Sequence, residues 1–150
     1  MLSTTTGKID IVPGGLVDQP QTAGPPVLII EDNAAQARFC GELLGAIGYD
    51  VNFATDGLMG LNMLDRLQPV LILLDLEMPK YDGVGFLQRL SSKLGDRRTP
   101  VIVMTSSLSV GVITKVCSLG ATDFISKPID PGTLIEKATK HARIRRPAAA

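Results

Sequence analysis

A run of five aliphatic residues, 70–74, ends in Asp75 and constrains the fold of this chain more than any other feature. Pro69 and Pro79 bound the run and limit it to the length of a strand, because proline cannot donate to a ladder of backbone hydrogen bonds. The run is apolar throughout rather than alternating, and this predicts a strand buried on both faces, as in a parallel sheet between two layers of helices. Asp75 would then follow the carboxyl end of that strand, which is where open α/β sheets bind ligands.

Asp75 has an ordinary structural alternative, since an aspartate after a strand is often the N-cap of a helix. Pro79 and Gly83 argue against that role, because they predict a turn before the next helical pattern. Two other aspartates, Asp56 and Asp82, each precede a glycine. The Asp-Gly pair is typical of turns, and both residues are predicted to lie in turns.

Four more short apolar runs alternate with amphipathic stretches along the chain. The apolar runs predict strands at residues 27–30, 51–53, 70–74, 101–104 and 123–126, and the stretches between and after them predict helices at 34–44, 58–67, 84–94, 110–119 and from 131. Strands that alternate with helices predict an α/β fold with a five-stranded parallel sheet and helices on both faces.

Hydrophobic spacing also predicts which helical residues face the sheet. Phe39, Leu43 and Ile47 recur at helical spacing in the first helix, and a leucine stripe runs from Leu58 to Leu67 in the second. All of these side chains are predicted to belong to the core.

The overall composition excludes several classes of protein. Over 150 residues, 15 basic and 15 acidic side chains cancel, and aromatic residues make up 4% with no tryptophan. The chain therefore has neither the net field nor the base-stacking surface that would predict direct nucleic-acid binding. No apolar run approaches the roughly 20 residues that span a bilayer, so no membrane association is predicted.

The cysteines and the histidine predict no additional site. The start of the chain lacks the basic and apolar regions of a secretory signal, which indicates a cytoplasmic protein. Cys40 and Cys117, the only two cysteines, are predicted to be buried thiols in that reducing compartment. His141 is predicted to be an ordinary surface residue of the basic last helix.

Composition divides the chain into three parts. Residues 1–25 are rich in Thr, Gly, Pro and Gln, with strand character only at residues 9–12, and are predicted to be a disordered N-terminal extension. The folded domain is predicted to cover residues 26–144, and residues 145–150 are predicted to be a short C-terminal tail.

Polar residues follow four of the five predicted strands. Because the carboxyl ends of parallel strands lie at one edge of the sheet, these residues are expected to converge. They are Glu31, Asp32 and Asn33 after the first strand, Asp75 after the third, Thr105 and Ser106 after the fourth, and Lys127 after the fifth.

This set of residues predicts phosphoryl chemistry. Partly buried carboxylates repel one another and rise in pKa unless a cation neutralises them, and Mg²⁺ is the commonest oxygen-binding ion beside phosphoryl groups. Lys127 and Thr105 add a positive charge and a hydroxyl donor for an anion. Together they predict a site that stabilises a phosphoryl group on Asp75, with this carboxylate as the nucleophile.

Four segments of the chain resemble the receiver domain family of two-component response regulators, the CheY-like proteins. They are residues 27–33, 73–83, 100–106 and 120–128, and they occur in the family's order with similar separations. The Asp-x-x-Met-Pro and Lys-Pro elements are the most specific, and the likeness covers residues 26–143. The resemblance implies the (βα)5 flavodoxin-like receiver fold.

The resemblance also implies roles for the strand-end residues. Asp75 would accept the phosphoryl group and Lys127 would pair with its oxygens. Asp32, Asp75 and the backbone carbonyl of Glu77 would bind Mg²⁺ directly, and Glu31 would act through water.

Two further residues would form the switch in this family. Thr105 would move to hydrogen-bond the phosphoryl group, and Phe124, at the position of the switch aromatic, would swing inward after it. Phe124 lacks the hydroxyl of the commoner tyrosine, so its switch is expected to depend on packing alone. The Lys127–Pro128 peptide bond would be cis.

The chain departs from the family pattern at several positions. Glu31 stands where aspartate is commoner, and Ser106 stands where a small residue, often alanine, is usual. Glu77 and Ser107 occupy the positions that tune phosphoryl lifetime in the family. None of these residues is expected to disable the site.

Partners are likewise implied by the resemblance. The phosphodonor would be a histidine kinase or a histidine phosphotransfer protein, and the family allows a homodimer through the face made by the fourth helix, fifth strand and fifth helix. No DNA-binding, cyclase or kinase domain follows Arg146. The chain is therefore expected to be either a single-domain regulator or a piece of a longer protein, with an unidentified effector or output domain.

Two other functions remain open at this point. An aspartyl phosphohydrolase also carries carboxylates at strand ends, but it usually has a second aspartate two residues after the nucleophile, where this chain has Glu77. A receiver-like module that is never phosphorylated is the second alternative, and the intact set of acids, Thr105 and Lys127 argues against it. The favoured prediction is a phosphoacceptor switch rather than an enzyme.

Overall fold

Five strands form one parallel sheet in the computed structural model, which describes residues 10–12, 15–17, 24–78 and 83–144. The order across the sheet is β4-β3-β5-β6-β7, and every neighbouring pair is parallel. All residues of the central strand β5 are buried, as the apolar run predicts. The strands are β3 (Pro26–Ile30), β4 (Asp50–Ala54), β5 (Leu71–Asp75), β6 (Val101–Thr105) and β7 (Asp123–Ser126).

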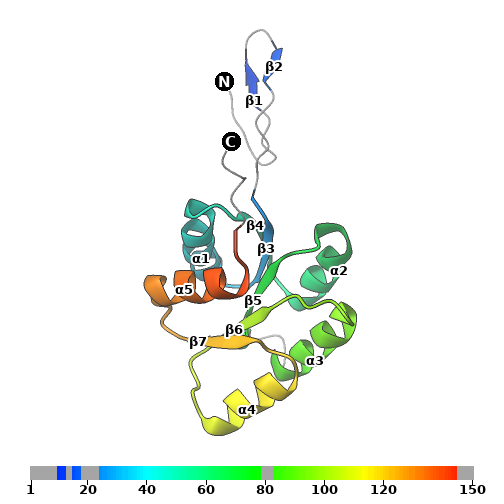
Figure 1. Ribbon diagram of the computed structural model, residues 1–150, viewed down its shortest axis with the longest axis vertical. Coiled ribbons are helices and arrows are strands. Elements are labelled where there is room, and N and C mark those ends of the chain that lie inside the picture. Colours follow the sequence, from blue (N-terminus) through cyan, green and yellow to red (C-terminus); the bar gives the residue numbers. More distant parts are fainter. Residues whose placement is uncertain (1–9, 13–14, 18–23, 79–82, 145–150) are drawn as a thin grey trace.

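Helices cover both faces of this sheet. Figure 1 shows α1 and α5 on one face and α2, α3 and α4 on the other. The predicted fold class, a five-stranded parallel α/β sheet of the flavodoxin-like receiver type, is therefore confirmed. The helices are α1 (Ala34–Ala46), α2 (Gly57–Leu67), α3 (Gly83–Leu94), α4 (Val110–Ser118) and α5 (Pro131–His141).

The core has two layers because successive strand residues point to opposite faces of the sheet. In β3, Val27 and Ile29 pack in the layer under α1 and α5, whereas Leu28 and Ile30 pack in the layer under α2, α3 and α4. Ile30 is in register with Leu74 of β5. The residues that follow these strands thus lie side by side at the same edge of the sheet.

The predicted core face of α1 is wrong at Phe39, whose side chain is 40% exposed. The buried residues of α1 are smaller on average, namely Ala37, Cys40, Gly41 and Leu44. A β-carbon on Gly41 would lie 2.6 Å from the Phe53 ring of β4. The close approach of α1 to the sheet therefore leaves no space for a side chain at position 41, and Phe39 lies outside the buried face of the helix.

The predicted core face of α2 is wrong at Leu58. Leu58 is 57% exposed, while Gly57, Gly60 and Leu64 are the buried residues of this helix. Asp56 does not form a free turn, because its side chain accepts a hydrogen bond of 2.8 Å from the Met59 amide and caps α2. The other predicted turn residue, Asp82, lies outside the described residues.

Two short strands precede the sheet. β1 (Asp10–Val12) and β2 (Gly15–Val17) form an antiparallel pair, and the second of them was not predicted. Apart from these strands and residues 24 and 25, the predicted disordered extension lies outside the described residues, as does the tail at 145–150. Disorder of that extension stays a prediction.

The prediction of buried thiols is confirmed for Cys40 and wrong for Cys117. Cys40 is buried, and burial raises the pKa of its thiol to about 11, whereas Cys117 is exposed on α4. Among the described residues, no helix combines the length and the apolar character needed to cross a membrane.

Candidate active site

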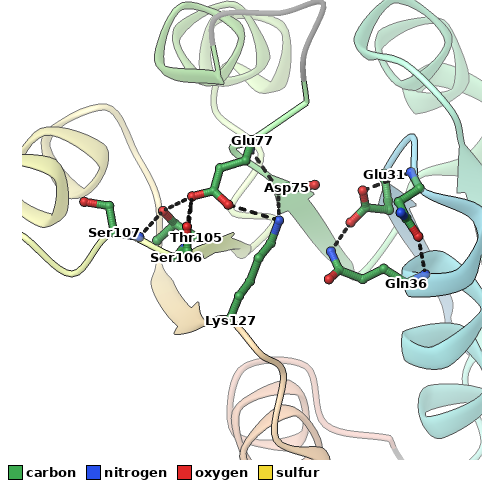
Figure 2. Close-up of polar contacts among 9 residues, drawn as sticks. Glu31, Gln36, Asp75, Glu77, Thr105, Ser106, Ser107 and Lys127 are labelled. Carbon is green, nitrogen blue, oxygen red and sulfur yellow. Dashed lines mark hydrogen bonds and ion pairs between the residues drawn. The ribbon is translucent and has the colours of Figure 1, made fainter.

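Asp75 ends β5 with a side chain that is almost fully buried. Its Oδ1 atom accepts hydrogen bonds from the Glu77 amide at 2.8 Å and from Lys127 Nζ at 2.7 Å. Figure 2 shows Lys127 reaching up to Asp75 from the segment that follows β7. The carboxylate therefore faces an amine from a distant segment and does not take the alternative role of a helix N-cap.

Two further carboxylates lie beside Asp75. Carboxylate oxygens of Glu31, Asp32 and Asp75 all lie within 4.8 Å of one another, with Glu31 and Asp75 buried and Asp32 exposed. The three predicted acids are therefore brought together. They open onto a pocket of about 420 Å³ lined by Glu31, Asp32, Asn33, Gln36, Asp75, Glu77 and Lys127.

The electrostatics of Glu31 favour a cation at this cluster. Burial, followed by the neighbouring Asp75 carboxyl, raises the pKa of Glu31 to about 7. A hard divalent ion held by carboxylate oxygens would relieve this repulsion, and the all-oxygen donor set suits Mg²⁺. Glu31 and Asp32 follow β3, and Asp75 ends the neighbouring strand β5. Their carboxylate oxygens therefore converge and fit this ion.

Gln36 is a member of the site that the sequence analysis missed. Its side-chain amide donates to Glu31 Oε1, while the Asn33 amide donates to Glu31 Oε2 at 3.1 Å. Asn33 in turn caps α1 by accepting the Gln36 amide at 2.9 Å. The Asn-x-x-Gln pattern is that of a capping box and could have indicated that Gln36 points back toward the strand end.

Thr105 ends β6 and is buried next to the acidic residue Glu77. Its Oγ1 atom donates to Glu77 Oε2 at 3.2 Å and accepts the Ser107 amide at 3.0 Å. The Ser106 amide and hydroxyl donate to the same Glu77 oxygen, at 2.8 and 2.6 Å. These side-chain contacts of Glu77 were not predicted, and its backbone carbonyl as a metal ligand stays a prediction.

Glu77 and Lys127 are held in their charged forms. The pKa of Glu77 is lowered to about 2, mainly by the hydrogen bond from the Ser106 hydroxyl, although burial acts in the opposite direction. Burial lowers the pKa of Lys127, but the hydrogen bond to Asp75 and the contact with Glu77 outweigh it, so that the pKa of this amine is raised. The Lys127–Pro128 peptide bond is cis, as expected.

Phe124, at the expected switch position in β7, is half-buried and lies under a charged side chain. Lys137 of α5 places its Nζ atom 4.8 Å from the centroid of the Phe124 ring and donates to the Phe124 carbonyl at 2.6 Å. The sequence analysis expected Phe124 to depend on packing alone and did not include Lys137. A lysine in the last helix is the only sign of this contact in the sequence, and it is a weak one.

His141 is not the ordinary surface residue that was predicted. Its side chain is 18% exposed, and its Nε2 atom lies 2.8 Å from Asp123 Oδ2. Lys137 Nζ lies 2.9 Å from Asp123 Oδ1. Burial would raise the pKa of Asp123, but the hydrogen bonds from Lys137 and His141 outweigh it and lower this pKa to about 2.

The arrangement places the Asp75 carboxylate between the Lys127 amine and two further carboxylates. Lys127 stands on one side of Asp75, and the Glu31 and Asp32 carboxylates can hold a divalent cation on the other. An oxyanion that is attached to Asp75 would be stabilised from both sides. Such an arrangement suits an aspartyl phosphate.

Known proteins are similar to this chain in sequence and in fold. Residues 27–139 match the model of the response regulator receiver domain. The DNA-binding dual master transcriptional regulator RpaA of Synechocystis is 37% identical over 71% of this chain and 44% of its own length. A protein-glutamate methylesterase/protein-glutamine glutaminase of Treponema pallidum is 41% identical over 68% of this chain and 26% of its own length.

Solved structures agree with these relatives. The chemotaxis protein CheY4 of Vibrio cholerae is similar with a TM-score of 0.71 and 26% identity, over 79% of this chain and 99% of that one. The chain spans less than half the length of the curated relatives it matches. With the family model matched over most of its length, the chain belongs to the response regulator receiver domains of two-component signalling.

Proposed function

We infer that Asp75 is the phosphoacceptor of this receiver domain and that its phosphorylation switches the conformation of the chain. The observation that carries this proposal is the position of Asp75 Oδ1, 2.7 Å from Lys127 Nζ. On the other side of Asp75, the oxygens of Glu31 and Asp32 approach within 4.8 Å.

The neighbouring residues have separate parts in this proposal. Glu31, Asp32, Asp75 and the Glu77 carbonyl would hold Mg²⁺, which when bound supplies positive charge to the phosphoryl oxygens. Lys127 neutralises the same oxygens from the opposite side. Thr105 contributes its hydroxyl and moves toward the phosphoryl group, and Phe124 then turns inward, which shifts an existing equilibrium between two states of the domain.

A histidine kinase or a histidine phosphotransfer protein is the proposed phosphodonor, in the cytoplasm. The named relatives combine their receiver-like part with other activities, a transcriptional regulator in one case and a methylesterase/glutaminase in another. The receiver itself acts as a switch on such an output domain or on a separate effector. The family also allows a homodimer through the face of α4, β7 and α5.

Intact-protein mass measurement after incubation with Mg²⁺ and acetyl phosphate tests the proposal. The wild type should gain the mass of one phosphoryl group, and Asp75→Asn should gain none. Asp96→Asn is the matched control, because Asp96 is an exposed acid outside the site. Rapid turnover of external phosphomonoesters would support a phosphohydrolase instead, and a wild type without adduct would support an inert binding module.

A further inference from the structure

Four hydrogen-bond donors and cations surround the carboxylate of Glu77. Its Oε2 atom accepts from Thr105 Oγ1 at 3.2 Å and from the amide and hydroxyl of Ser106 at 2.8 and 2.6 Å. Its Oε1 atom lies 3.3 Å from Lys127 Nζ. Figure 2 shows the carboxylate beside Asp75, between the end of β6 and Lys127. The Glu77 carboxylate is thus bound as an anion.

The hydrogens of these donors are already in use. A backbone amide and a hydroxyl each carry one hydrogen, so Ser106 spends both of its donors on Glu77. The Thr105 hydroxyl also has one hydrogen, and its oxygen accepts the Ser107 amide, which leaves the hydrogen for Glu77. A second anion can use the Thr105 hydroxyl and the Ser106 backbone amide only after Glu77 has left them.

We propose that the Glu77 carboxylate occupies, in the unphosphorylated chain, the place at the Thr105 hydroxyl, the Ser106 backbone amide and Lys127 that a phosphoryl group on Asp75 takes over, whereas the Ser106 hydroxyl serves Glu77 alone. This inference rests on the proposed function and adds an internal competitor to it. Ser106 strengthens the competitor, because its hydroxyl supplies a bond to Glu77 that alanine would not. Glu77 and Ser106 are therefore positioning residues that set how readily the site accepts an oxyanion.

The competitor can be displaced without disturbing the core. The Glu77 side chain is 36% exposed, so it has solvent to rotate into, whereas Thr105 and Asp75 are buried. If Glu77 blocks the donors nine-tenths of the time, the apparent affinity for a competing oxyanion falls about tenfold. Removal of the Glu77 side chain should raise the apparent affinity for the oxyanion by the same factor.

Beryllofluoride, an inert analogue of a phosphoryl group, provides the test. The wild type, Glu77→Ala, Ser106→Ala and the double variant are titrated with it at fixed Mg²⁺, and the backbone amide NMR spectrum reports saturation. Glu42→Ala is the matched control, because Glu42 is an exposed glutamate of α1 outside the site. Glu77→Ala should saturate at roughly a tenfold lower concentration than the wild type, and Glu42→Ala at the same concentration.

Ser106→Ala separates occupation of the place from simple charge repulsion, because it leaves the net charge unchanged. It should lower the saturating concentration about threefold in the wild type, where it loosens Glu77, and leave it unchanged in Glu77→Ala. An equal effect of Ser106→Ala in both backgrounds would overturn the inference.

The outcomes also separate this inference from the proposed function. Saturation of the wild type without any gain in Glu77→Ala would overturn the internal competitor and leave the phosphoacceptor site standing. A complete lack of beryllofluoride binding in the wild type and in all variants would overturn both.

Discussion

Lys137 of α5 holds its Nζ atom 4.8 Å from the centroid of the Phe124 ring in β7. The same ammonium group donates to the Phe124 carbonyl and pairs with Asp123. The backbone and the ring of the expected switch residue are therefore both attached to the last helix. An inward turn of the ring would break the cation–π contact with Lys137. The contacts of α5 therefore depend on the conformation of Phe124.

Substitution of Lys137 by methionine should destabilise the domain by about 1–2 kcal/mol, because it removes the cation–π contact and leaves the partly buried Asp123 with one partner fewer. Urea unfolding followed by circular dichroism measures this loss. Lys140→Met is the matched control, since Lys140 is an exposed lysine of the same helix. Equal stability of the two variants would show that the Lys137 contacts do not contribute to the free energy of unfolding.

The Asp123 cluster predicts an acid-sensitive contribution to stability. The pKa of Asp123 is about 2 in the folded chain against an ordinary value of 3.8. A lowered folded pKa means that the contribution is complete above the ordinary value and disappears as the pH falls through the folded one. The wild type should therefore exceed Asp123→Asn by about 2 kcal/mol at pH near 6, and the difference should shrink between about pH 4 and pH 2.

Chemical unfolding of both proteins across that pH range measures the difference. Asp65→Asn is a useful comparison, because Asp65 pairs with Lys93 and Arg97 at the surface with a side chain that is 66% exposed. Its pH-dependent effect should be smaller than that of Asp123→Asn, since solvent screens it. A difference between wild type and Asp123→Asn that stays constant with pH would contradict the assignment.

Gly60 is predicted to be required by packing and not by backbone conformation. A β-carbon at this position would lie 2.8 Å from Ile30 Cδ1, in the buried layer between α2 and β3. Gly60→Ala should therefore cost about 1 kcal/mol, with overpacking exceeding the gain in helix propensity. Gly111 in α4 has no atom within 4 Å of such a carbon, so Gly111→Ala should be neutral or stabilising by about 0.5 kcal/mol. Thermal unfolding of the two variants and of the wild type measures these differences in stability. A Gly60→Ala variant that is more stable than the wild type would refute the packing argument.

Magnesium should stabilise the folded chain through Glu31, Asp32 and Asp75. At a concentration of Mg²⁺ near one hundred times the dissociation constant, the gain in the free energy of unfolding should reach about 2.7 kcal/mol. Asp32→Asn should lose most of that gain, because it removes an oxygen charge from the cluster without touching a buried residue. Unfolding at increasing Mg²⁺ concentrations measures the effect, and Asp50→Asn serves as the exposed acidic control. The same response in Asp32→Asn and wild type would place the ion elsewhere.

Much of the fold and of the candidate site could be predicted because the relevant signals are local. The apolar run before Asp75 indicates a strand that is buried on both faces, and alternating strands and helices leave few parallel topologies. Once the sheet is parallel, Glu31, Thr105 and Lys127 must meet Asp75 at one edge. Periodicity failed at Phe39 and Leu58, because hydrophobic spacing alone does not show which apolar residues of a helix face the sheet.

Patterns within short segments were enough to predict the α/β class, the strand ends that carry Asp75 and Lys127, and membership of the receiver family. Which long side chains pair across the site could be seen only in the folded chain. Glu77 binds the donors of Thr105 and Ser106, Gln36 holds Glu31, and Lys137 covers Phe124. Such pairings depend on distances between residues of different elements, which are set only when the helices have packed on the sheet.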